Sequence, residues 1–143
     1  MTDLLDLYNY AEERGTGVYW FTLEYAESLS YCDPDGDCFV ALDPGHLYTL
    51  AEEKVKLSHE LGHCETGSFY NRYAACEVRE KHENRADKWA IERVVGREEL
   101  NAAVASGHTE LWDLADFFGV TEEFMRKAVC WYKNGNLATE YYP

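Results

Sequence analysis

The stretch KLSHELGHCETG, residues 56–67, places two histidines four positions apart, with a glutamate directly after the first. On an α-helix, His59 and His63 would lie about 40° apart around the axis and about 6 Å apart along it, so both rings can reach one ion. Glu60 would lie about 100° further round, where its carboxylate can hydrogen-bond a water molecule without binding the metal. The pattern therefore predicts a metal-binding helix of the zinc peptidase type.

The motif needs a further ligand, because a catalytic zinc ion is held by three protein side chains and keeps a fourth position open. A metzincin would continue with Gly at position 66 and His at position 69, where this chain has Thr66 and Phe69. That class is therefore excluded. A gluzincin instead takes a glutamate from a following helix, and the segment HENRADKWA, residues 82–90, offers Glu83.

Asp87 stands four residues after Glu83, on the same face of the predicted helix. Its carboxylate could accept the second ring N–H of a ligand histidine and so fix the tautomer of that ring. We therefore predict that His59, His63 and Glu83 bind one Zn²⁺ per chain and that Glu60 acts as the catalytic base. Mn²⁺, Fe²⁺ and Co²⁺ also suit such a ligand set.

Several weaker candidates surround this set. Tyr70 and Tyr73 lie in the connection between the two helices. We expect this connection to overhang the metal, so either hydroxyl could donate a hydrogen bond to a developing oxyanion. Cys64 and Cys76 are close to the two motifs, but we interpret them as structural thiols. His82 is expected on the surface.

Hydrophobic periodicity predicts a single α+β domain over residues 1–143. A first helix near the start is followed by three short strands, of which the last two are joined by the turn sequence DPDGD, so we predict a small, mostly antiparallel sheet. The motif helix should begin at Leu47 or Thr49 and end at Gly67. The remaining helices are predicted over residues 75–95, 97–106, 109–119 and 121–135, and the last three form a C-terminal helical part, about 97–135.

Two features of the helix pair bear on its packing. Gly62 costs about 1 kcal/mol relative to Ala in the middle of a helix, so we expect another segment to pack closely against it. The buried side of the second helix is predicted to carry Val78, Ala86, Trp89, Ala90 and Val94.

Composition excludes several classes of partner. The formal net charge of −14 repels nucleic acid and anionic lipid surfaces. No apolar run approaches the roughly 20 residues that span a bilayer, and the start of the chain lacks the basic region of a signal peptide. The five cysteines form no CxxC pair, which favours reduced thiols. We therefore expect a cytoplasmic protein without a membrane segment.

Two motifs, LSHELGHCETGSFYN at residues 57–71 and KHENRADKWA at residues 81–90, resemble the ImmA/IrrE family of metallopeptidases. The aromatic segment VYWF, the hairpin around DPDGD and the segment LADFFGVTEEFMRKAV are also similar to the layout of that family. The resemblance implies a minimal zincin-like fold with the ligands and base named above. It also implies a substrate, a helix-turn-helix repressor of a phage or another mobile element.

Three functions follow from these observations. We favour a zinc-dependent endopeptidase that cleaves such a repressor. The alternative is a non-catalytic antirepressor, in which the same metal-stabilised fold binds and sequesters the repressor. A DNA-binding regulator is the third, because residues 111–133 have the pattern of a helix-turn-helix, but its second helix begins with Glu122 and Glu123, which disfavours direct contact with nucleic acid.

Overall fold

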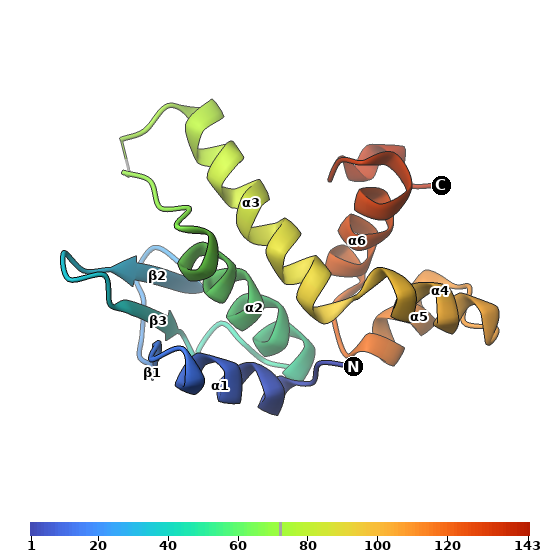
Figure 1. Ribbon diagram of the computed structural model, residues 1–143, viewed down its shortest axis with the longest axis horizontal. Helices are drawn as coiled ribbons and strands as arrows, with labels where there is room; N and C mark the ends of the chain where they lie inside the picture. The colour runs from blue at the N-terminus through green and yellow to red at the C-terminus, as the bar shows by residue number, and fades with distance from the viewer. Residues whose placement is uncertain (72) are drawn as a thin grey trace.

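The computed structural model describes residues 1–71 and 73–143, and this part of the chain contains six α-helices and one three-stranded sheet (Figure 1). In chain order the elements are α1 (Leu4–Glu13), β1 (Gly17–Trp20), β2 (Ser28–Cys32), β3 (Cys38–Leu42), α2 (Leu50–Thr66), α3 (Cys76–Val94), α4 (Arg97–Ala105), α5 (Leu111–Phe118), α6 (Glu122–Asn134) and the 3-10 helix η1 (Thr139–Tyr141). The predicted α+β class is confirmed. Figure 1 shows the sheet at one end, α1 below α2 and α3 above it in the middle, and α4 to α6 at the other end.

The sheet is mixed, with the strand order β1-β3-β2. β2 and β3 form the predicted antiparallel hairpin, in which the Asp33 carboxylate accepts hydrogen bonds from the N–H groups of Asp35 and Asp37 and so stabilises the turn. β1 pairs with β3 in parallel, so the expectation of a mostly antiparallel sheet does not hold. The reason is the connection after β1, which carries the chain to the far edge and leaves the central position to β3. β2 is consequently an edge strand.

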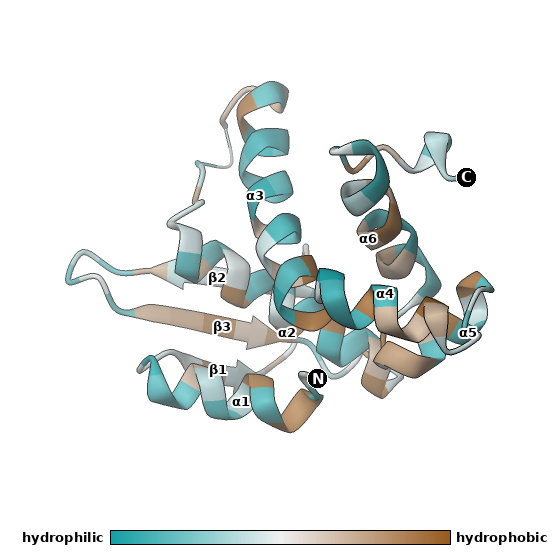
Figure 2. Cartoon of the chain, turned by 45° about the vertical axis from the view of Figure 1, so that its right-hand side comes forward, coloured by the Kyte–Doolittle hydropathy of each residue, from teal (hydrophilic) through white to brown (hydrophobic). Residues whose placement is uncertain are grey.

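The part of the core beside the sheet is formed where α1, β3 and α2 meet, and the same cluster of buried side chains continues through α3 to α6. Leu7, Val40, Leu42, Leu57 and Leu61 are all fully buried there. Figure 2 shows β3 as the apolar strand of the sheet and the first half of α3 as a mainly hydrophilic helix. This half extends beyond the core, and there the prediction for the buried side of α3 is wrong at Val78, which is 43 % exposed. Further along α3, Ala86, Ala90 and Val94 are buried as predicted.

Both ends of α2 follow from local sequence. The Thr49 hydroxyl accepts a hydrogen bond from the Glu52 N–H and caps the first turn. Gly67 ends the helix in the left-handed conformation with φ of 65°, which glycine adopts without steric cost. Both boundaries were predicted.

The α2–α3 contact explains the glycine in the middle of α2. A Cβ atom at Gly62 would lie 2.5 Å from the carbonyl oxygen of Ala86 and 3.0 Å from its Cα atom. The backbones of the two helices therefore approach each other where only glycine fits, as predicted. This approach brings the ligand candidates on α3 alongside those on α2.

The C-terminal helices pack against the rest of the chain through α6 and a buried lysine. Phe124, Met125 and Ala128 of α6 are buried, and the Thr121 hydroxyl caps this helix by accepting a hydrogen bond from the Phe124 N–H. Lys54 of α2 is 5 % exposed and donates a hydrogen bond to the Phe118 carbonyl at the end of α5. Burial lowers the pKa of Lys54. Its ammonium group lies at the C-terminus of α5, which is a favourable place for a cation.

The helices of the described residues also bear on membrane insertion. None of these described helices combines the length and the apolar character that crossing a bilayer requires.

Candidate metal centre

Three predicted ligands converge between α2 and α3. The Nε2 atom of His59 lies 3.2 Å from the Nε2 atom of His63 and 2.7 Å from Oε2 of Glu83. Nε2 of His63 lies 3.3 Å from the same carboxylate oxygen. Among the described residues, His59, His63 and Glu83 form the group of side chains that could hold a metal ion.

The other ring nitrogen of each histidine is already used. His59 Nδ1–H donates to Oδ1 of Asp87 over 2.7 Å. His63 Nδ1 lies 2.5 Å from the carbonyl oxygen of Ser68, and because a carbonyl oxygen can only accept, this nitrogen must carry the proton. Both Nε2 atoms are thereby directed to the common centre, which is the arrangement that second partners give to metal-binding histidines.

Two of the three distances between these atoms fit a small tetrahedral ion. Ligand atoms that are about 2.0–2.1 Å from a tetrahedral zinc lie about 3.3 Å from one another. The distances from His63 to the two other ligand atoms have this value, and the distance from His59 to Glu83 is that of a direct hydrogen bond. Two imidazole nitrogens and one carboxylate also match the chemical preference of Zn²⁺. The residues present therefore fit the ion that the sequence predicts.

Hydrogen bonds within the site raise the pKa of the histidine and lower the pKa of the acids. Burial opposes a charge on His59, but its hydrogen bonds to Asp87 and Glu83 raise the pKa of this histidine to about 10. Burial also disfavours the charged form of Glu83 and by itself would raise the pKa of this acid. The hydrogen bonds from His59, His63 and Tyr70 outweigh burial and lower the pKa. The carboxylates thus hold a positive charge at this centre, which is also what a cation requires.

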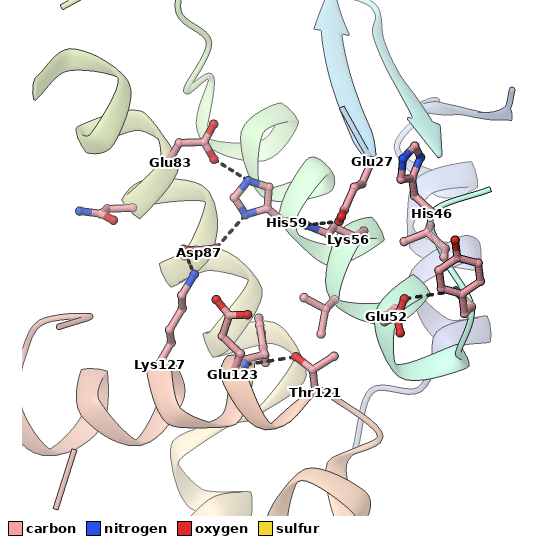
Figure 3. A pocket seen from close by; sticks show the side chains of 15 residues that line it. Glu27, His46, Glu52, Lys56, His59, Glu83, Asp87, Thr121, Glu123 and Lys127 are labelled. Atoms are coloured by element: carbon pink, nitrogen blue, oxygen red, sulfur yellow. Dashed lines mark hydrogen bonds and ion pairs between the residues drawn. The ribbon is translucent and has the colours of Figure 1, made fainter. Parts of the chain in front are cut away.

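α6 reaches the site through Asp87. The Lys127 ammonium group lies 3.2 Å from Oδ2 of Asp87, whose other oxygen accepts the hydrogen bond from His59. Figure 3 shows the three side chains in succession, from α6 through α3 to α2. Burial alone would raise the pKa of Asp87, but its bonds to His59 and Lys127 lower it. Asp87 was predicted to orient a histidine, whereas Lys127 was missed because nothing in its local sequence links it to residues 40 positions earlier.

Glu60 lies beside the three converging side chains and is not one of them. Its side chain is buried, with 6 % of the residue exposed, and its Oε2 atom accepts a hydrogen bond of 2.6 Å from the Ser28 hydroxyl of β2. This is the relation that the helical spacing predicts for a base that is not a ligand. Ser28 was missed by the sequence analysis, although its position in an alternating strand could have drawn attention to it.

The two tyrosines named from the sequence have different surroundings. Tyr70 donates a hydrogen bond of 2.5 Å to Oε1 of Glu83, and burial together with this carboxylate raises its pKa to about 12. In this arrangement Tyr70 supports a ligand candidate. Tyr73 is 80 % exposed, and its role as an oxyanion donor stays a prediction. His82 is half-buried with its ring stacked on Tyr70, so it is less exposed than expected.

Two cavities flank the converging side chains. The larger, about 660 Å³, lies between α2, α3 and α6 and is lined by His59, Glu83 and Lys127 among others (Figure 3). The smaller, about 280 Å³, lies between β2, α2 and residues 68–70, and Glu60 and His63 line it. The candidate metal centre is therefore open on two sides.

Cys64 is half-buried and Cys76 exposed, and neither belongs to the ligand group found among the described residues.

Comparison with known proteins identifies one family. Residues 45–129 match a peptidase family described as the IrrE N-terminal-like domain. The match covers more than half of the chain and extends from the segment before α2 into α6, so it includes His59, His63 and Glu83. No curated protein and no solved structure matches the chain.

Proposed function

The chain belongs to the peptidase family of IrrE N-terminal-like domains, and from this premise we propose that it is a zinc-dependent endopeptidase that cleaves a helix-turn-helix repressor of a phage or another mobile element. The family implies a metallopeptidase. The substrate class comes from the resemblance of the two motifs to the ImmA/IrrE family. A cytoplasmic location agrees with such a substrate and with five free cysteines.

The observation that carries the proposal is the convergence of two Nε2 atoms and one carboxylate next to a buried acid that is not among them. His59, His63 and Glu83 would hold the zinc ion. When bound, the ion supplies Lewis acidity, which makes a water molecule more acidic and a peptide carbonyl more electrophilic. A site that only had to stabilise the fold would be closed by a fourth protein ligand and would need no acid beside its ligands.

Glu60 is placed to move the proton. Among the described residues, Ser28 donates a hydrogen bond to the Glu60 carboxylate. Because this bond uses Oε2, the other oxygen, Oε1, is left for water. As general base, Glu60 takes a proton from the attacking water, and as general acid it returns that proton to the departing amine. The scissile bond is thereby replaced by a carboxylic acid and a free amine.

The surroundings of the site suit a polypeptide substrate. β2 is an edge strand and lines the smaller cavity through Ser28, Leu29 and Ser30. An unpaired strand edge offers backbone N–H and C=O groups to which an extended segment can pair. Cavities on both sides of the centre leave room for the chain to continue in either direction.

The α5–α6 hairpin supports this proposal over direct DNA binding. α6 begins with Glu122 and Glu123, which repel phosphate groups. Lys127 is engaged with Asp87 beside the metal centre. The apolar side of the helix, including Phe124, is buried. We therefore propose that α6 forms one wall of the larger cavity.

The test is to replace the proposed base while the ligands stay intact. We expect purified Glu60→Gln to retain about one zinc per chain by mass spectrometry and to lose cleavage of the neighbouring repressor, because an amide cannot take the proton. His63→Ala should lose both zinc and cleavage. Glu65→Gln is the matched control, since this glutamate lies on the same helix but is bonded to Arg14, and it should cleave normally.

Two results would contradict the proposal. Cleavage by zinc-loaded Glu60→Gln at the wild-type rate would remove Glu60 from the mechanism. An intact complex with the repressor, without fragments and unaffected by Glu60→Gln, would instead identify a non-catalytic antirepressor.

A further inference from the structure

The side of β2 that faces α2 carries small polar residues. Ser28, Ser30 and Cys32 are half-buried, whereas Leu29 and Tyr31 between them are exposed, as the alternation of a strand requires. Ser28 is held in register by its pairing with Leu42 of β3. The backbone of β2 therefore fixes where the Ser28 hydroxyl lies relative to α2.

Ser28 is the member of this row that reaches Glu60. The distance of 2.6 Å between Ser28 Oγ and Glu60 Oε2 is that of a charge-assisted O–H···O bond. Glu60 is 6 % exposed, and a buried carboxylate that loses its donor bears the full cost of desolvation. The hydrogen bond thus holds one oxygen of a buried side chain from a different element of the fold.

We propose that Ser28 is a positioning residue for the peptidase reaction, whose hydroxyl fixes the Glu60 carboxylate so that Oε1 faces the attacking water. The inference rests on the proposed function of Glu60. The terminal torsion of a glutamate has a broad energy minimum, so an external donor is needed to hold the carboxylate plane. Because β2 also lines the smaller cavity, the same strand that borders the substrate path sets the orientation of the base.

Kinetics with fluorescence-quenched casein, or with the repressor if casein is not cleaved, test this role. We expect Ser28→Ala to lower kcat about tenfold or more, since one charge-assisted hydrogen bond is lost, with KM within about twofold of wild type. Ser28→Thr retains the hydroxyl and should recover most of kcat. Cys32→Ala is the matched control and should keep the kcat of wild type, because Cys32 lies further along the same side of β2 and lines neither of the two cavities.

A second measurement does not depend on activity. Urea unfolding of wild type, Ser28→Ala, Glu60→Ala and the double variant, at one fixed free zinc concentration, forms a thermodynamic cycle. We expect the pair to be coupled by about tenfold in the unfolding equilibrium constant. Zinc affinity should be the same in Ser28→Ala and wild type, because Glu60 is not among the ligands.

The outcomes separate the two proposals. If wild type cleaves and Ser28→Ala has the kcat of wild type, Ser28 is not a positioning residue, whether or not the cycle shows coupling. Absence of coupling, or a loss of kcat that Cys32→Ala shares, also overturns it. If wild type cleaves neither casein nor the repressor, the peptidase proposal fails first, and the positioning role fails with it.

Discussion

Hydrogen bonds from the Nδ1 atoms of His59 and His63 fix the orientation of the two rings. Each donates its proton to a fixed oxygen, one on Asp87 and the other on the Ser68 carbonyl. The Nε2 atoms are then directed inward without any rotation of the rings, so little conformational entropy has to be lost when an ion binds. The charge of Asp87 would also make His59 a more basic ligand for an ion bound there.

Replacing Asp87 tests this contribution. Asp87→Asn keeps the shape of the side chain but removes its charge, and we expect zinc affinity to fall about tenfold to a hundredfold. A competition titration against a chelating dye measures it. Asp113→Asn is the control, because Asp113 also bonds a histidine Nδ1 atom, that of His108, which lies in the connection between α4 and α5. An Asp87→Asn protein that binds zinc like Asp113→Asn would show that the orienting bond is unimportant.

The distance between α2 and α3 decides whether the three ligand candidates meet. His59 and His63 come from one helix and Glu83 from the other, so a small displacement of α3 would separate them. Gly62 sets this distance, because it permits the contact with the Ala86 backbone. Glu83 stands one turn before Ala86 and Asp87 directly follows it, so packing and ligand placement are coupled at this point.

A methyl group at Gly62 should therefore affect both stability and metal binding. Gly62→Ala gains about 1 kcal/mol in helix propensity, but the new Cβ meets backbone atoms that cannot move alone. We expect a net loss of about 1–3 kcal/mol in the free energy of unfolding, measured by urea denaturation, together with weaker zinc binding.

Gly96→Ala provides the comparison for this substitution. There an added Cβ approaches only the flexible end of the Glu99 side chain, at 3.2 Å from its Oε1 atom. We expect little change in stability or zinc affinity. Equal effects of the two substitutions would show that the α2–α3 approach does not control the site.

Across the whole molecule, the candidate metal centre connects parts that are otherwise joined by ordinary packing. α2 contacts the sheet and α1, α3 leads into the C-terminal helices, and Lys127 of α6 bonds to Asp87 beside the ligands. An ion bound between α2 and α3 would therefore hold both halves of the chain together. Such binding adds to the stability of the folded state only.

Zinc removal should consequently lower the stability of the entire fold. At a free zinc concentration a thousandfold above Kd, binding contributes about 4 kcal/mol to the free energy of unfolding. We expect a chelator to remove this amount from wild type in calorimetry and to leave His63→Ala unchanged. A chelator effect of equal size in both proteins would mean that the stabilising ion binds elsewhere.

Much of the candidate site was accessible from the sequence because its spacings are local. Four residues separate His59 from His63 and Glu83 from Asp87, and a helix places such residues on one face without reference to the rest of the chain. The boundaries of α2 at Thr49 and Gly67 have the same origin, since capping depends on neighbouring residues.

Other contacts were settled only by the tertiary structure. The parallel pairing of β1 with β3, the exposure of Val78 and the bonds from Ser28 to Glu60 and from Lys127 to Asp87 join or separate residues that are far apart in the chain. The spacing of residues along the chain was enough to show which side chains share a helical face, and therefore which of them could bind a metal. Tertiary packing decided which groups hold them in place, because a hydrogen bond between distant segments exists only where the whole fold brings a donor within about 3 Å of an acceptor.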